Sequence, residues 1–143
     1  MLFEIKLEEL EKRYGEMKKR ITISESKNQK AIEQELVDMK KEYQANESLL
    51  EKCVASGCQP AISALALAQL TYCRQTEKIL EDQMNSFFHS ELGSETEREA
   101  EALALYAEYA IDFATMAIDH ALIAALSAES LNMKEEEDRD ERS

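Results

Sequence analysis

The segment from residue 94 to about residue 133 constrains the fold most, because it is apolar on nearly every side of a helix. At 3.6 residues per turn, its polar side chains fall in one narrow arc. The arc holds Glu101, Glu108, Asp112, Thr115 and Asp119. A helix at the surface of a small monomeric bundle needs one broad apolar face, and this one has three. The segment therefore predicts a helix that is packed on several sides.

A bulky apolar stripe on this helix raises the question of what covers it. The stripe and its neighbouring histidine are Tyr106, Tyr109, Phe113, Met116, His120 and Ile123. Leaving several such side chains in water would forgo about 1.5–3 kcal/mol for each. That loss is comparable with the net stability of a domain, roughly 5–15 kcal/mol. We therefore predict that the stripe is covered. Either residues 2–21 fold back as a fourth helix of the same bundle, or another chain covers the stripe, and we favour a second copy of the chain.

The remainder of the chain also has helical periodicity. Apolar side chains at alternating spacings of four and three run from Phe3 to Ile21 and resume at Ile32, as in a coiled coil. We expect one helix over residues 2–54, and a break near residues 22–26 is the alternative. The Thr22 to Glu25 sequence TISE would then be a capping box that starts a second helix. The first seam supplies further candidate interface residues: Leu7, Leu10, Tyr14 and Met17.

Two boundaries separate the predicted helices. The first is ASGCQP at residues 55–60, where Gly57 suits a helix end and Pro60 suits a helix start. The second is SELGS at residues 90–94, where Ser94 and Glu97 form a capping box. The predicted fold is an all-α antiparallel helical bundle or coiled coil of three long helices, or four if the first is broken. Residues 1–133 are expected to form one domain, and the charged residues 134–143 a disordered tail.

Charge and composition narrow the function. The chain has 17 basic and 30 acidic residues, a net charge of -13, which disfavours binding to nucleic acid and to anionic lipid. Residues 102–126 are long enough to span a bilayer, but Asp112 and Asp119 would each cost about 2.5–3.5 kcal/mol at the membrane centre. The N-terminus does not resemble a secretory leader. We therefore expect a cytoplasmic protein with no nucleic-acid or membrane partner.

The residues that could carry chemistry do not form a recognisable site. The spacing Glu-x-x-His of di-iron bundles is absent, since Ser86 and Ala117 stand three residues before the two histidines. Three cysteines without a secretion signal predict free thiols, with Cys58 the most reactive because it precedes a helix N-terminus. Neither a cofactor, a metal nor a catalytic residue is predicted.

The sequence therefore predicts a helical interaction module without enzymatic activity, such as a structural subunit, an adaptor or a small chaperone-like accessory protein. It would act through self-association as a homodimer and through helix–helix contacts, with its acidic flanks attracting a basic protein partner. Two alternatives stay open. One is a metal- or redox-active bundle that uses cysteines and carboxylates, and the other is an acidic inhibitor that imitates nucleic acid.

Overall fold

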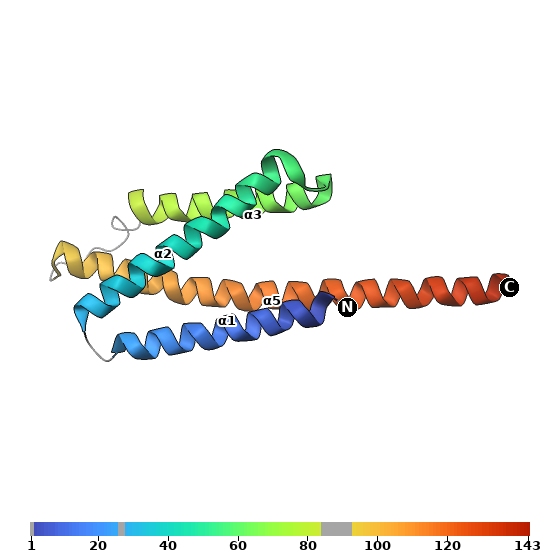
Figure 1. The fold of residues 1–143 in the computed structure, drawn as a ribbon, viewed down its shortest axis with the longest axis horizontal. Helices are drawn as coiled ribbons and strands as arrows, with labels where there is room; N and C mark the ends of the chain where they lie inside the picture. The colour runs from blue at the N-terminus through green and yellow to red at the C-terminus, as the bar shows by residue number, and fades with distance from the viewer. Residues whose placement is uncertain (1, 26–27, 84–92) are drawn as a thin grey trace. The chain divides into compact units, whose positions relative to one another are not determined.

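The computed structural model describes residues 2–25, 28–83 and 93–143, and these are helical almost throughout (Figure 1). No strand occurs within these ranges, so the predicted all-α class is confirmed. In chain order the elements are α1 (Leu2–Glu25), α2 (Gln29–Lys52), the π-helical turn η1 (Cys53–Gly57), α3 (Pro60–Asp82) and α5 (Glu95–Arg142).

The helices are grouped in two compact units, Met1–Tyr72 and Cys73–Ser143. The first unit contains α1, α2, η1 and the N-terminal part of α3. The second contains the last turns of α3 and all of α5. The candidate interface residues of α1 and those of α5 therefore belong to different units.

The first predicted helix is broken, so the expectation of one continuous helix over residues 2–54 is wrong and the four-helix alternative is correct. α1 ends at Glu25, and Asn28 caps the start of α2. The Asn28 side-chain oxygen accepts hydrogen bonds from the N–H groups of Lys30, at 3.1 Å, and Ala31, at 3.4 Å. These bonds satisfy two of the donors that a helix N-terminus leaves unpaired.

The capping box predicted at Thr22 does not form. The Thr22 hydroxyl donates instead to the carbonyl of Lys18, at 2.8 Å, inside the last turns of α1. A threonine hydroxyl that bonds back by four residues is a common alternative to capping. The helix consequently continues past Thr22 and ends three residues later, at Glu25.

The two other predicted boundaries agree with the structure where it describes them. η1 ends at Gly57 and α3 begins at Pro60, as the ASGCQP segment predicts. At the second boundary, the Ser94 hydroxyl accepts a hydrogen bond from the Glu97 N–H at 3.2 Å and α5 begins at Glu95. Residues 84–92, which include the first three residues of the predicted boundary, lie outside the described residues.

α5 runs to Arg142, where the sequence predicts a disordered tail over residues 134–143. No glycine or proline follows Gly93, so nothing in the backbone stops the helix. An ion pair joins Glu135 to Arg139 at 3.6 Å, one helical turn apart. Arg139 and Arg142 also lie in the last turn, where the helix dipole favours positive charge.

Very little apolar surface is buried within the described chain. Its buried hydrophobic residues are Ala66, Leu70 and Ala102, of which only Leu70 is large. A domain of about 150 residues usually buries roughly two thirds of the surface of its unfolded chain. The described residues thus have the secondary structure of a helical bundle without a corresponding core.

Replacing Asn28 with alanine should destabilise the start of α2. Alanine removes the oxygen that accepts from Lys30 and Ala31, and loss of such a cap costs about 1 kcal/mol. Urea unfolding followed by circular dichroism measures the loss. An Asn28→Asp variant, which keeps an acceptor oxygen, should stay close to the original protein. An Asn28→Ala variant as stable as the original would show that this cap does not contribute.

Candidate functional site

The candidate interface residues of α1 all lie on one side of that helix and are exposed. Their exposed fractions range from 42% for Met17 to 60% for Leu7. The ammonium of Lys18 lies over the Tyr14 ring, 4.8 Å from its centre. The predicted seam is therefore present as a continuous apolar face in the first unit.

The candidate residues of α5 form a second apolar face, in the second unit. Tyr109, Phe113, Met116 and Ile123 have exposed fractions between 43% and 63%. His120 is also exposed, and Tyr106 is half-buried. The structure thus gathers each predicted set along its own helix.

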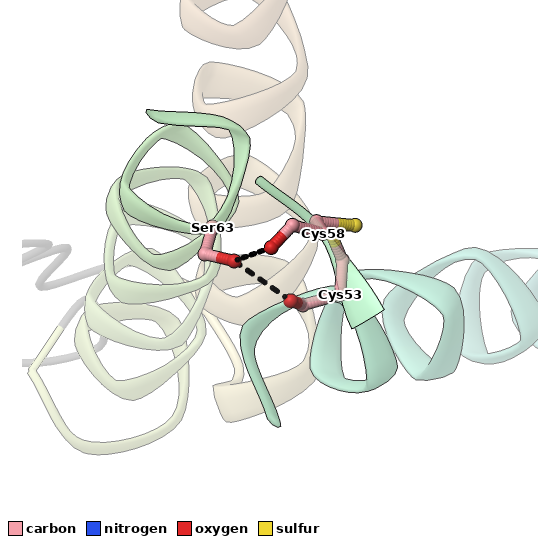
Figure 2. The surroundings of a disulfide bond; sticks show 3 residues. All are labelled: Cys53, Cys58 and Ser63. Atoms are coloured by element: carbon pink, nitrogen blue, oxygen red, sulfur yellow. Dashed lines mark hydrogen bonds between the residues drawn. A yellow bond between two sulfur atoms is a disulfide. The ribbon is translucent and has the colours of Figure 1, made fainter. Parts of the chain in front are cut away.

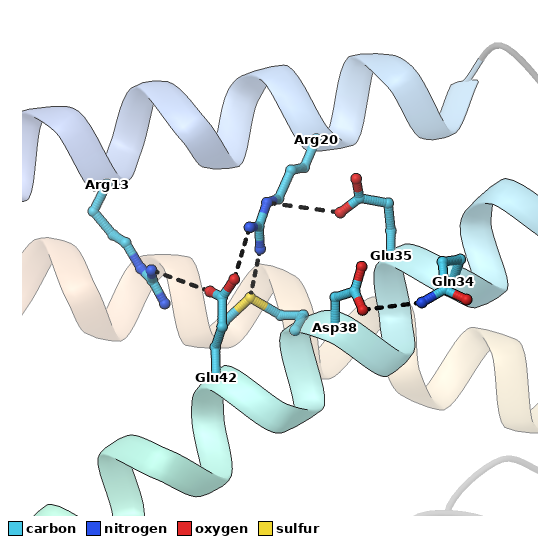
Figure 3. Close-up of polar contacts among 7 residues, drawn as sticks. Arg13, Arg20, Gln34, Glu35, Asp38 and Glu42 are labelled. Carbon is cyan, nitrogen blue, oxygen red and sulfur yellow. Dashed lines mark hydrogen bonds and ion pairs between the residues drawn. The ribbon is translucent and has the colours of Figure 1, made fainter.

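An ion-pair network joins α1 to α2 within the first unit, and sequence reasoning did not find it (Figure 3). Arg20 donates to Glu42 at 2.9 Å and pairs with Glu35 at 3.7 Å. Arg13 also donates to Glu42, at 3.4 Å. In addition, the Arg20 guanidinium contacts the Met39 sulfur at 3.0 Å. α1 therefore folds back on α2. This is possible because α1 ends at Glu25 and α2 begins only at Gln29.

The spacing of these charges could have revealed the pairing. Arg13 and Arg20 are seven residues apart, and so are Glu35 and Glu42. Each of these four residues stands directly before an apolar seam position of its helix. Residues that flank the seam in this way are the ones that form ion pairs between helices of a coiled coil. The matching spacing in the two helices predicts that the two arginines of α1 lie opposite the two glutamates of α2.

Both central members of the network have shifted pKa values. The hydrogen bond from Arg20, together with its charge, lowers the pKa of Glu42 despite some desolvation. The same hydrogen bond raises the pKa of Arg20 above its already high value. Both groups stay charged at neutral pH and are occupied with one another, so the network is suited to positioning helices rather than to proton transfer.

The disulfide between Cys53 and Cys58 contradicts the prediction of free thiols (Figure 2). Cys58 is not a free reactive thiol in the structure, and Cys73 is the free cysteine among the described residues. The pairing requires the chain to turn sharply through η1. Sequence spacing missed it because four intervening residues match no familiar cysteine motif.

No other cluster in the described ranges suggests chemistry. No group of three or more His, Cys, Asp or Glu side chains there could hold a metal ion. One hollow in the second unit is lined by Leu80 and Glu81 of α3 with Glu99, Ala102 and Leu103 of α5. The two carboxylates of its lining, from Glu81 and Glu99, have no histidine, cysteine, serine or lysine beside them in that lining to complete a catalytic set.

One described helix, α5, meets the length and hydropathy expected of a membrane span. An 18-residue window within it has a mean hydropathy of 1.4, and none of that window is buried. Length and composition alone qualify it, as they also qualify core helices of soluble proteins.

Comparison with known proteins gives no match: no family model, no curated protein and no solved structure is significantly similar to this chain.

The Glu42 network should give the protein a specific dependence on pH. Because the folded-state pKa of Glu42 is lowered, its stabilising contribution is complete above the ordinary value of 4.5 and is lost as the pH falls through the folded-state value. A Glu42→Gln variant should therefore be less stable than the original protein at about pH 7 and nearly equal to it at about pH 2.5. Urea unfolding at the two pH values measures both differences.

The control is Glu8→Gln, since Glu8 on α1 has no ion-pair partner among the described residues. It should change stability little at either pH. A Glu42→Gln effect that is equally large in acid would contradict the role of the Glu42 charge.

Proposed function

We propose that this protein is a non-enzymatic helical interaction module that acts by self-association, with a homodimer as its working form. The observation that supports this proposal most is the shortage of buried apolar surface. Three hydrophobic residues are buried in the described chain, while the apolar faces of α1 and α5 are open. Water-exposed faces of this extent usually mark an interaction surface.

The α5 stripe is the part of the surface with the most to gain from a partner. Tyr109, Met116 and Ile123 are exposed by 59%, 62% and 63%. Burying three such side chains would contribute on the order of 5 kcal/mol. Four exposed apolar positions of α1 add to this. A contact between apolar helix faces needs no catalytic or ligand-binding group.

We propose that this protein works in the cytoplasm with basic protein partners, and the distribution of charge supports basic partners rather than nucleic acid or membrane. Residues 1–60 hold 11 basic and 12 acidic residues, which leaves 6 and 18, a net of -12, for residues 61–143. The α5 region would thus attract a positively charged protein surface and repel anionic lipid. Asp112 and Asp119 also make insertion of α5 into a bilayer unfavourable.

The role of the stripe can be tested with two double variants of the full chain. Met116→Gln with Ile123→Gln removes apolar surface from the stripe and keeps side chains that favour helix. It should weaken dimerisation by at least about tenfold, equivalent to 1.4 kcal/mol, in sedimentation equilibrium. The matched control, Thr115→Gln with Ser130→Gln, changes exposed residues on the polar side of α5 and should dimerise like the original protein.

A compact monomer at micromolar concentration would contradict the proposal and would mean that the two units cover each other's apolar faces. Equal dimerisation of the two double variants would contradict the assignment of the stripe. Co-flotation of the protein with vesicles of neutral lipid would favour a bilayer as the covering partner instead.

A further inference from the structure

The Cys53–Cys58 disulfide lies at the junction of two helices, in the part of the first unit shown in Figure 2. Cys53 is the first residue of η1, directly after α2, and Cys58 has extended backbone two residues before α3. Their Cα atoms are 5.3 Å apart, within the range that a disulfide spans without moving the backbone. The bond closes a short ring across the turn.

Other interactions hold the same turn. The Ser63 hydroxyl, in the first turns of α3, lies 3.1 Å from the Cys53 carbonyl oxygen and 3.4 Å from that of Cys58. Pro60 fixes the backbone at the start of α3. A ring of so few residues removes little chain entropy from the unfolded state. The disulfide is therefore not the only interaction that holds this turn.

Solvent can reach the bond from the Cys58 side. Cys58 is exposed and Cys53 is half-buried. Cys58 also lies at the N-terminus of α3, a helix of 23 residues, where the helix dipole favours a thiolate. A thiolate stabilised in this way is more abundant at neutral pH, and it leaves more readily when a mixed disulfide at Cys58 is resolved. Exposure and helix position thus both favour exchange with small thiols.

We propose that Cys53 and Cys58 form a reversible dithiol–disulfide couple whose reaction partners are thiol and disulfide compounds. In reduction, a thiolate of a dithiol attacks the exposed Cys58 sulfur, forms a mixed disulfide and releases the Cys53 thiolate. The second thiol of the reductant then displaces Cys58 and becomes part of a disulfide itself. Two electrons pass to the cysteine pair, and protons from solvent complete the two thiols. In oxidation by oxidised glutathione, the Cys58 thiolate attacks the glutathione disulfide, forms a mixed disulfide and releases one glutathione thiolate. The Cys53 thiolate then attacks the Cys58 sulfur, re-forms the Cys53–Cys58 bond and releases the second glutathione thiolate.

Thiol–disulfide exchange takes place at the α2–α3 turn and does not require self-association through the apolar faces. It can be tested on the full chain with a Cys73→Ser substitution, which removes the remaining free thiol of the described residues. The protein is equilibrated, without denaturant, in glutathione buffers of graded redox potential. Alkylation and mass spectrometry then report the oxidised fraction of the pair, and circular dichroism reports the helices.

The expected result is a complete transition in both directions, with the same oxidised fraction reached from either side and unchanged helical content. Resistance to reduction until denaturant is added, or loss of helix on reduction, would make the bond a structural one and overturn the proposal. Failure to re-form the Cys53–Cys58 bond on oxidation would also overturn it.

Two single variants test the assigned order of reaction. Cys53→Ser leaves Cys58, which should form a mixed disulfide with oxidised glutathione at least about tenfold faster than Cys53 does in the Cys58→Ser variant. Equal rates, or faster reaction of Cys53, would contradict the assignment of Cys58 as the sulfur that is attacked.

Discussion

The need to bury apolar surface is the constraint on which the rest of this structure depends. Backbone groups within the described helices are hydrogen-bonded to one another, and the caps pair some of the groups at the helix ends. The secondary structure is therefore well formed. The deficit is in side-chain packing, since Leu70 is the one large hydrophobic residue among those that are buried. Hydrophobic burial is the dominant favourable term in folding, so a protein with this deficit gains most from a partner.

The polar interactions act within this constraint and decide how the helices are arranged. Asn28 caps the start of α2, and the Arg20–Glu42 pair fixes which part of α1 lies against α2. Partly exposed ion pairs contribute little to stability but do select a register. The charges therefore orient the first unit and leave its apolar seam open. The Cys53–Cys58 disulfide adds a covalent connection to the same unit, at the C-terminal end of α2.

Features encoded by a few neighbouring residues could be predicted from the sequence. Ser94 and Glu97 have the spacing of a capping box, and the Ser94 hydroxyl does cap α5. Gly57 with Pro60 marks a turn, so both boundaries can be predicted. Asn28 was missed because no glutamate follows it at the third helical position, whereas Thr22 has one. Residues 134–142 were expected to be disordered from their charge alone, although the Glu135–Arg139 spacing favours helix.

Features that depend on distant residues could not be read in the same way. The Cys53–Cys58 bond and the Arg20–Glu42 pair form only once the chain has turned between them. The apolar stripe can be predicted in part, because its residues follow from local spacing but its covering does not. Its residues are predicted by helical spacing, and the structure shows Tyr109, Met116 and Ile123 exposed. The second copy of the chain that we propose to cover them cannot be deduced from spacing within one helix.

Photo-crosslinking from within the stripe tests the central claim most directly. Tyr109 is replaced with p-benzoylphenylalanine, and equal amounts of light and ¹⁵N-labelled protein are mixed, allowed to exchange and irradiated. If a second copy covers the stripe, crosslinks should join a light chain to a heavy chain as often as random pairing of the two forms predicts. Crosslinks confined to peptides of the same isotope would show that each chain covers its own stripe, and the account of self-association would be wrong.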